Sequence, residues 1–426
     1  MRWLAIATVF AGLAGYAVVV FATLTLGATN FAAFNVFWSA FFMLSGIVQG
    51  IMYETTRGVR DAQPAEANAT TDDVPGIVAE SAAAEPATDT AVSAVRSKPL
   101  APAMAIGGVT AIVLLATSWV WSPALFASSD PWLSVAVLTV AVIGFAFQSV
   151  VAGILSGMGR WNWYALLVAL EAALRMLAAI VGLLVGANLA TFLIITAMGV
   201  FATPMLMLAT PVRETLTQEI RTNTRTFVRN ALSAMVAASA TTIMVVGFPV
   251  LVKATRLEAD PTLLSNLLLA VLLTRAPILV PLQAFQNAIV VYFVDRRDAL
   301  TRALLTPVVG VVAVGAVGAV LAYFIGPWLF TLMGDGFQIS GEVLAILTFA
   351  SALTGALFVT GAATLAKELH AHYIGGWWVA SIIAVLVLLF TADLQTAVLL
   401  ALLIGPLCGV VWHVAALALT RSKHAH

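Results

Sequence analysis

The chain has 426 residues, of which 62% are hydrophobic and 9% are charged, and its mean hydropathy is +1.03. Soluble domains carry about 25% charged residues, so this composition excludes a soluble globular protein and indicates an integral membrane protein. The net charge of zero argues against nucleic acid as a partner, and the single cysteine, Cys408, excludes an internal disulfide and a cysteine-based metal site.

Apolar stretches long enough to cross a bilayer as a helix, at about 20 residues each, recur along the chain twelve times. In chain order they are 3–27, 32–53, 103–126, 132–157, 163–186, 189–210, 228–252, 264–294, 306–329, 341–366, 373–391 and 396–419. The first lacks a convincing cleavage site, so we expect no removable signal peptide. The pattern predicts an all-α integral membrane protein with about twelve transmembrane helices.

Lysine and arginine are distributed unevenly between the loops. With the N-terminus inside, sixteen of the 20 Lys and Arg residues fall on the inner side, and only Lys253 and Arg256 fall outside. Cytoplasmic loops carry the excess of basic residues in membrane proteins. We therefore expect a multi-pass plasma-membrane protein with both termini in the cytoplasm.

Residues 61–99 differ from the rest of the chain. They are rich in Ala, Pro, Thr, Asp and Glu and show no hydrophobic periodicity. Such a segment buries too little apolar surface to offset the entropy lost on ordering. It is predicted to be a disordered cytoplasmic loop.

An internal repeat relates the two halves. "VWSPALFASSDPWL", from Val120, resembles "FIGPWLFTLMGDGF", from Phe324, and both place a proline near the end of a span. Because six spans is an even number, the halves have the same orientation and are related by a pseudo-two-fold axis along the membrane normal, around a central cavity. The predicted parts are an N-terminal six-helix half (1–210), a cytoplasmic linker (211–227) and a C-terminal six-helix half (228–426).

Two segments carry a resemblance to a known family. "TLTLGATNFAAFNVFWSAFFMLSGIVQG" resembles the first hairpin of polysaccharide flippases in the multidrug/oligosaccharidyl-lipid/polysaccharide (MOP) superfamily, and "GILSGMGRWNWYALLVALEAALRMLAAIVGLLVG" resembles their fourth-to-fifth span junction. The resemblance implies an alternating-access flippase of the bacterial plasma membrane that moves a polyprenyl-(pyro)phosphate-linked sugar for cell-envelope polysaccharide synthesis. The implied partners are this anionic lipid-linked sugar, membrane lipids and envelope polysaccharide glycosyltransferases. No cofactor is expected.

Arg275 lies about eleven residues, or roughly 17 Å, into the eighth span. A charge at mid-bilayer costs at least ~2.5–3.5 kcal/mol, so three interpretations arise: an anion-binding cavity residue, a partner to helix-end carbonyls or an acid, or a side chain that snorkels to the interface. The guanidinium fork suits phosphate, and related lipid II flippases are thought to use a cavity arginine on this span. Pro277 and Pro281 are expected to bend the helix beside it.

Other polar residues in the spans are candidates for the cavity wall, since such residues usually face a bundle interior or a wet cavity. Asn35, Ser39, Gly46, Gln49 and Tyr53 share one face of the second span, within about 80° of one another. Gln286 shares the face of Arg275, and Gln283 and Asn287 lie beside it. For all of them, hydrogen bonding between helices competes with this interpretation.

Two further sets of charges complete the predicted site. Glu171 and Arg175 are spaced as an intrahelical ion pair, which either stabilises packing or acts in transport. A cytoplasmic basic mouth is predicted to attract the anionic headgroup and consists of Arg57, Arg60, Arg296 and Arg297.

Rival functions follow from the same residues. A multidrug or cation exporter of the same superfamily commonly uses buried carboxylates, and Glu171 is the one carboxylate in the middle of a span. A non-transporting scaffold of envelope assembly and a membrane glycosyltransferase also compete with the flippase interpretation. The sequence has no G-x-x-x-x-G-K loop, so direct use of ATP is not expected. We expect a transporter rather than an enzyme.

Overall fold

Helices account for nearly all regular structure in the computed structural model, which describes residues 2–63, 96–127, 130–296, 300–334 and 336–422. Eleven of the described helices are long and apolar enough to cross a membrane. The first of them, Trp3–Asp61, contains the first two predicted spans. The prediction of an all-α, multi-pass membrane protein is confirmed.

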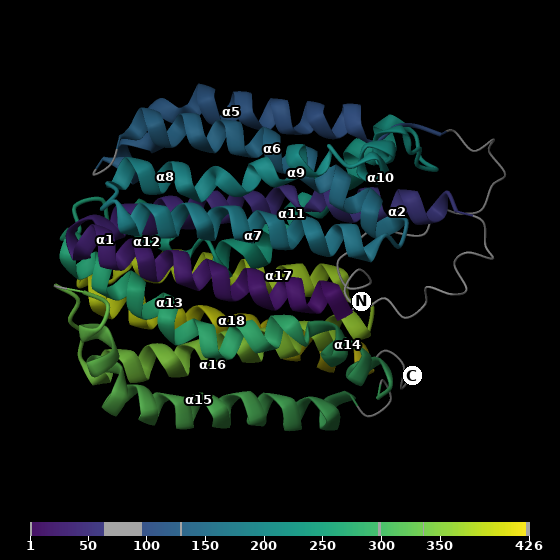
Figure 1. Cartoon of the computed structure of the whole chain (residues 1–426). Coiled ribbons are helices and arrows are strands. Elements are labelled where there is room, and N and C mark those ends of the chain that lie inside the picture. The colour runs from purple at the N-terminus through teal and green to yellow at the C-terminus, as the bar shows by residue number, and fades with distance from the viewer. Residues whose placement is uncertain (1, 64–95, 128–129, 297–299, 335, 423–426) are drawn as a thin grey trace. The chain divides into compact units, whose positions relative to one another are not determined.

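The chain divides into two compact units, and the helices of both are labelled in Figure 1. The first comprises Met1–Leu26 and Ala33–Thr242, and the second comprises Gly27–Ala32 and Ile243–His426. Helices up to the main part of α11 are α1 (Arg2–Val48), α2 (Gly50–Asp61), α5 (Leu100–Phe126), α6 (Pro131–Gly157), α7 (Trp161–Leu184), α8 (Leu189–Ala197), η1 (Met198–Phe201), α9 (Ala202–Leu206), α10 (Thr210–Arg213), η2 (Glu214–Thr217) and α11 (Thr224–Val245). The later helices are α12 (Phe248–Thr255), α13 (Pro261–Ala284), α14 (Gln286–Val294), α15 (Leu300–Thr331), α16 (Gly341–Ala366), α17 (His370–Phe390) and α18 (Leu394–Ser422).

Three predicted spans are interrupted rather than continuous. Span 189–210 becomes α8, the 3₁₀ turn η1 and α9, and span 228–252 breaks between α11 and α12. The eighth span contains Pro277 and Pro281 inside α13, yet its break falls later, at Phe285. The break therefore falls at neither proline, and the expected bend beside Arg275 stays a prediction.

Gly27 separates the first two predicted spans within α1. Its backbone angles, φ 65° and ψ 175°, are non-helical and lie in a region that only glycine adopts without strain. A residue with a Cβ at this position would strain the turn between the two helical segments.

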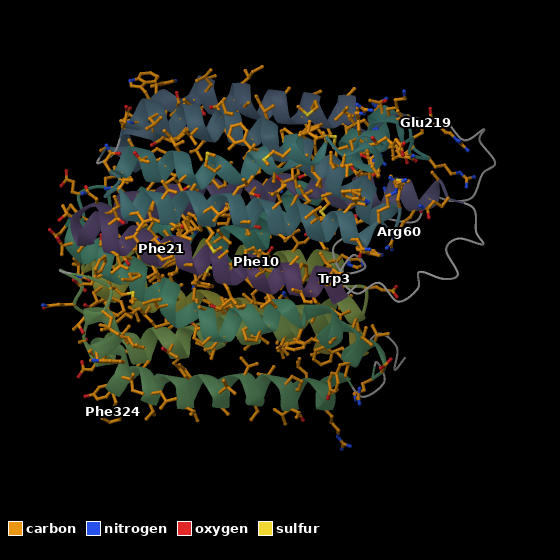
Figure 2. All side chains as sticks on the ribbon, in the orientation of Figure 1. Trp3, Phe10, Phe21, Arg60, Glu219 and Phe324 are labelled. Carbon is orange, nitrogen blue, oxygen red and sulfur yellow. The ribbon has the colours of Figure 1, made fainter. Side chains whose placement is uncertain are left out.

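Polar and apolar atoms segregate along the helices. In Figure 2, nitrogen and oxygen atoms gather toward the helix ends, where the labelled Arg60 and Glu219 lie in the first unit. The labelled Phe10 and Phe21 lie along the carbon-rich length of α1. This is the distribution expected of helices whose central turns face hydrocarbon and whose ends face water.

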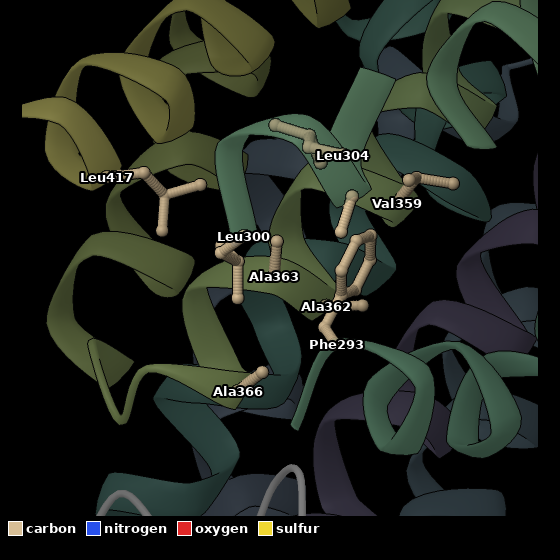
Figure 3. Packing of buried hydrophobic residues seen from close by; sticks show 9 residues of the cluster. Phe293, Leu300, Leu304, Val359, Ala362, Ala363, Ala366 and Leu417 are labelled. Carbon is tan, nitrogen blue, oxygen red and sulfur yellow. The ribbon is translucent and has the colours of Figure 1, made fainter. Parts of the chain in front are cut away.

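Small residues allow close helix packing in the second unit. Helix α16 contacts α13, α14, α15, α17 and α18. Figure 3 shows one cluster at this centre, made of Phe293, Leu300, Ala303, Leu304, Val359, Ala362, Ala363, Ala366 and Leu417. Alanines on α16 bring the neighbouring backbones close, which is how membrane helices gain packing energy in the absence of a hydrophobic drive.

Glycines play the same part around α2 in the first unit. A Cβ on Gly50 would collide with the Met235 backbone nitrogen and would lie 2.7 Å from the Met235 Cα, so α2 and α11 touch backbone to backbone there. On the other side, a Cβ on Gly153 of α6 would lie 2.7 Å from the Thr55 Cβ. Thr56 Oγ1 also lies 2.8 Å from Ser156 Oγ. Helix α2 is thus held tightly between α6 and α11.

The predicted disordered loop 61–99 has ordered ends. Asp61 is the last residue of α2, and Gln63 Nε2 donates to the Gly157 carbonyl at 3.2 Å. At the other end, Ser97 forms an isolated antiparallel bridge with Ile220. Both boundaries of the prediction are therefore corrected, and residues 64–95 lie outside the described part of the chain.

Candidate functional site

A buried ion pair forms the first polar centre, in the first unit. Arg175 Nη2 donates to Glu171 Oε1 at 2.9 Å, one helical turn away on α7, as their spacing predicted. Gln148 Nε2 of α6 donates to the other carboxylate oxygen of Glu171 at 2.7 Å. Arg175 Nε donates to the Thr196 carbonyl at 3.0 Å. The pair is thereby tied to both α6 and α8.

The break after α8 gives Arg175 its backbone partner. Helix α8 ends at Ala197 and continues as the 3₁₀ turn η1, and helix ends leave carbonyls without intrahelical partners. Gly199, within η1, lies against the pair, because a Cβ there would collide with Arg175 Nη2 and lie 2.7 Å from Glu171 Cγ. A glycine at this position thus lets η1 approach the charged groups.

Aromatic rings of α1 cover the guanidinium. The Arg175 Cζ lies 4.8 Å from the Phe42 ring centroid, 5.8 Å from that of Phe41 and 5.9 Å from that of Trp38. Cations interact favourably with ring faces at this range. The Arg175 side chain is 7% exposed and that of Glu171 is 19% exposed, so the carboxylate is the more accessible member of the pair.

Arg275 forms the second polar centre, in the second unit. Its Nη1 donates to the Val245 carbonyl at 2.9 Å and to the Met244 carbonyl at 3.3 Å, and its Cζ lies 5.2 Å from the Phe248 ring centroid. Because α11 ends at Val245, these are terminal carbonyls, and the negative end of the helix dipole attracts a cation. The contacts correspond to the helix-end interpretation, and the side chain is buried rather than extended to a surface, at 6% exposure.

The sequence contains a motif that marks the end of α11, the partner of Arg275, and that was not used in the predictions above. Gly247 precedes α12, and Pro249 stands in its first turn. Glycine followed by proline is typical of a helix boundary. The motif "GFPV" therefore indicated that the seventh span is interrupted, and hence that free carbonyls exist for a buried arginine.

The predicted polar face of the second span does not share one environment. Asn35 is fully buried, and neither its side-chain oxygen nor its nitrogen has a hydrogen-bond partner among the described residues. Ser39 is also buried, whereas Tyr53 is partly buried. Gln49 is exposed at the junction of α1 and α2, with Nε2 4.0 Å from Met52 Sδ. A role for these residues in substrate binding stays a prediction.

The polar residues of the eighth span are less completely described. Gln283 is exposed near the end of α13. The side chains of Gln286 and Asn287 lie outside the described part of the chain. Arg275 therefore has a defined partner, the end of α11, whereas no partner is described for these amides.

The predicted basic mouth is partly occupied by internal contacts. Arg57 donates from Nε (3.0 Å) and Nη2 (2.8 Å) to Glu54, whose Oε1 also accepts from Asn230 Nδ2 of α11 at 3.1 Å. Arg296 Nη1 donates to the Tyr292 carbonyl at 3.2 Å, and its Cζ lies 4.1 Å from the ring of the same tyrosine.

Of the other two residues of the predicted basic mouth, the structure describes one. Arg60 is partly exposed at the end of α2 (Figure 2), and Arg297 lies outside the described residues. Among the residues that the structure describes, no group of three or more His, Cys, Asp or Glu side chains is placed to hold a metal ion.

Relatives of the chain occur in mycobacteria. No protein-family model matches the chain. Uncharacterized protein Rv1510 of Mycobacterium tuberculosis (strain ATCC 25618 / H37Rv) is 37% identical over 416 residues, which cover 97% of this chain and 90% of the relative. Uncharacterized protein Mb3654 of Mycobacterium bovis (strain ATCC BAA-935 / AF2122/97) is 36% identical over 416 residues, which cover 97% and 91%.

Solved structures identify the fold. An inward-facing multidrug resistance MATE family transporter of the MOP superfamily superposes with a TM-score of 0.67 and 13% identity, covering 98% of this chain and 99% of the other. A MOP superfamily transporter from Pyrococcus furiosus Vc1 (DSM3638), whose binding pocket is described as having reverse polarity that suggests a different function, superposes with a TM-score of 0.58 and 14% identity, covering 98% and 95%. These solved structures are transporters of the MOP superfamily, and the likeness to them shows the fold. The chain belongs to the same family as the mycobacterial proteins Rv1510 and Mb3654, and it is a multi-pass membrane protein with the fold of the MATE transporters.

Proposed function

We propose that the protein is an alternating-access transporter that moves a polyprenyl-(pyro)phosphate-linked sugar or oligosaccharide across the plasma membrane. The observation that carries the proposal is the balance of charge inside the spans. Arg175 and Arg275 are both buried, while the one carboxylate in the middle of a span, Glu171, is ion-paired with Arg175. The excess of positive charge suits an anionic headgroup.

The proposed phosphate ligand is Arg275. The Val245 and Met244 carbonyls, to which its Nη1 donates, are neutral acceptors. Hydrogen bonds between arginine and phosphate are charge-assisted and roughly twice as strong as those between neutral groups. A phosphate oxygen that reached Arg275 would therefore compete well with the end of α11 for the guanidinium. Envelope polysaccharide glycosyltransferases are the proposed suppliers of the lipid-linked sugar.

The test is mass spectrometry of the lipids that co-purify in mild detergent with the wild-type protein and with Arg275→Gln. The matched control is Arg256→Gln, because Arg256 also donates to carbonyls at a helix end, those of Thr391 and Ala392 after α17. A polyprenyl-phosphate sugar present in the wild type and the control but depleted in Arg275→Gln supports the proposal. The same lipid in all three returns Arg275 to helix capping, and its absence from the wild type refutes the flippase.

A second candidate is a multidrug or cation exporter, favoured by the similarity to a multidrug resistance MATE family transporter at a TM-score of 0.67. Glu171 is then the coupling or binding group, since its carboxylate is 19% exposed and bonded to Gln148 and Arg175. Resistance of expressing cells to cationic dyes should be lost in Glu171→Gln and stay lost in the double variant Glu171→Gln/Arg175→Met, whose stability is expected to recover, while Arg275→Gln keeps it. Dye sensitivity that is unchanged by expression of the wild-type protein would exclude it.

A further inference from the structure

A cavity of about 430 Å³ opens at the turn between α6 and α7, in the first unit. It is lined by Gly159, Arg160, Trp161, Asn162 and Trp163. Neither the ion pair at Glu171 nor Arg275 takes part in it. The lining combines one permanent cation, two indole rings and one side-chain amide within five consecutive residues.

The backbone of the turn fixes where these side chains lie. Arg160 N donates to the Leu155 carbonyl at 2.8 Å and Gly159 N to the Ser156 carbonyl at 3.1 Å, while Gly159 has a φ of +69°. This is the Schellman arrangement, in which a left-handed glycine ends a helix. Helix α7 then begins at once, at Trp161, so the turn is too short to move its side chains away from the span ends.

Arg160 is held by a contact outside the turn. Its Nη1 donates to the Pro211 carbonyl of α10, which leaves the rest of the guanidinium fork for another acceptor. Trp161 packs against Tyr164, with ring centroids 6.5 Å apart, and Trp163 packs partly into the apolar cluster around Leu155 and Leu167. The cation and the rings are therefore fixed before any ligand arrives.

The turn belongs to a basic end of the first unit. Gln63, two residues after the end of α2, donates to the Gly157 carbonyl, which joins the turn to the helix end that carries Arg57 and Arg60. Arginine binds phosphate through its planar fork. Indoles settle where a membrane changes from hydrocarbon to headgroups, with the ring in the apolar layer and the N–H in the wet one. Clustered basic residues beside a span attract anionic lipids.

We infer that this cavity is a binding site for the headgroup of an anionic phospholipid. Arg160 holds the phosphate, Asn162 and the indole N–H groups are available to the headgroup oxygens, and the rings of Trp161 and Trp163 flank the glycerol and upper acyl chain. The site is separate from the proposed transport site and selects annular lipid by charge.

The test uses the purified full chain in detergent, titrated with dioctanoyl phosphatidylglycerol, dioctanoyl phosphatidylcholine or inorganic phosphate, with the thermal midpoint as readout. Phosphatidylglycerol should raise the midpoint of the wild type saturably. Arg160→Gln should weaken the apparent affinity roughly tenfold, as for the loss of one charge-assisted contact. Arg160→Lys keeps a charge and a donor for the Pro211 carbonyl but lacks the planar fork. Its apparent affinity for phosphatidylglycerol should lie between those of the wild type and Arg160→Gln, which would show that the loss in Arg160→Gln is not a folding defect.

The matched control is Arg213→Gln, which removes an exposed charge of α10 outside the cavity. Affinity for phosphatidylglycerol should stay within about twofold of the wild type, since surface charges act weakly. Equal loss in Arg160→Gln and Arg213→Gln would reduce the effect to general electrostatics and overturn the site. An equal response to phosphatidylcholine, or to inorganic phosphate alone, would overturn the assignment to an anionic lipid.

Discussion

Replacing Gly50 by alanine tests the packing of α2 directly. The added Cβ would collide with the backbone of α11, at Met235 N and 2.7 Å from the Ala234 carbonyl carbon and the Met235 Cα. Main-chain atoms cannot rotate away as a side chain can, so the two helices must separate. Overpacking of this kind costs about 1–3 kcal/mol.

Separation of the helices also affects a polar contact. Asn230 Nδ2 of α11 donates to Glu54 Oε1 of α2 at 3.1 Å, one turn beyond Gly50. Hydrogen bonds to charged groups contribute about 1.5–3 kcal/mol. Together the two effects destabilise the first unit in Gly50→Ala by about 2.5–6 kcal/mol.

The assay is thermal unfolding of purified protein in detergent, followed by tryptophan fluorescence. Gly15→Ala is the matched control, because a Cβ there meets nothing within 4 Å and alanine favours a helix. Asn230→Ala should lower the midpoint in the wild type but add little in Gly50→Ala, since coupled sites are not additive. A midpoint of Gly50→Ala equal to that of Gly15→Ala, or full additivity with Asn230→Ala, would refute the close approach of α2 and α11.

Substitutions at Glu171, Gly376 and Asp393 test three further contacts. Glu171→Gln should destabilise the protein by about 3–5 kcal/mol, because it leaves Arg175 buried without its counter-ion, and the double variant with Arg175→Met should recover most of the loss in the same unfolding assay. Gly376→Ala should cost about 1–3 kcal/mol, because its Cβ would collide with the buried imidazole of His413; a wild-type midpoint would contradict this contact. The backbone N–H and side chain of Thr396 hydrogen-bond to Asp393 and lower the pKa of that carboxyl. This stabilisation is present above the ordinary pKa of an aspartate and is lost as the pH falls through the lowered value, so Asp393→Asn should flatten that part of a pH–midpoint curve.

Helix ends were predictable where caps mark them. The predicted span 341–366 matches α16, and the predicted span 132–157 begins one residue after the start of α6. Ser340 and Asp130 each accept from backbone N–H groups of the first turn. Such caps stand next to the residues they serve, so a local pattern is sufficient to find them.

The distant partner of a break inside a span was not predictable by the same means. A local motif, Gly247 followed by Pro249, marks the break between α11 and α12, but it does not show which side chain pairs with the freed carbonyls. The end of α11 at Val245 depends on Arg275, 30 residues later, whose guanidinium satisfies the freed carbonyl. In a membrane, a helix breaks where a distant side chain or neighbouring helix can pair its open backbone groups, which a local pattern does not show.

The polar face of the second span illustrates a related limit of sequence reasoning. Helical hydrogen bonding continues through the junction of α1 and α2, because Gln49 N donates to the Ser45 carbonyl at 3.0 Å and Tyr53 N donates to the Gln49 carbonyl at 3.3 Å. Asn35 is nevertheless buried while Gln49 is exposed, so a shared helical phase does not give two residues the same environment. By contrast, Glu171 and Arg175 lie one helical turn apart on α7, where a spacing of four residues is sufficient to predict contact.

The two anchors beside the acidic segment have a practical consequence. Gln63 is tied to Gly157, and Ser97 to Ile220, within the same helical unit. The two ends of this connection are therefore each fixed by a contact with the unit itself. Doubling the length of such a connection costs only about 0.6 kcal/mol in closure entropy. An epitope, a fluorescent reporter or a crystallisation chaperone inserted between the two anchors is therefore expected to leave Gln63, Ser97 and the helices that they contact in place.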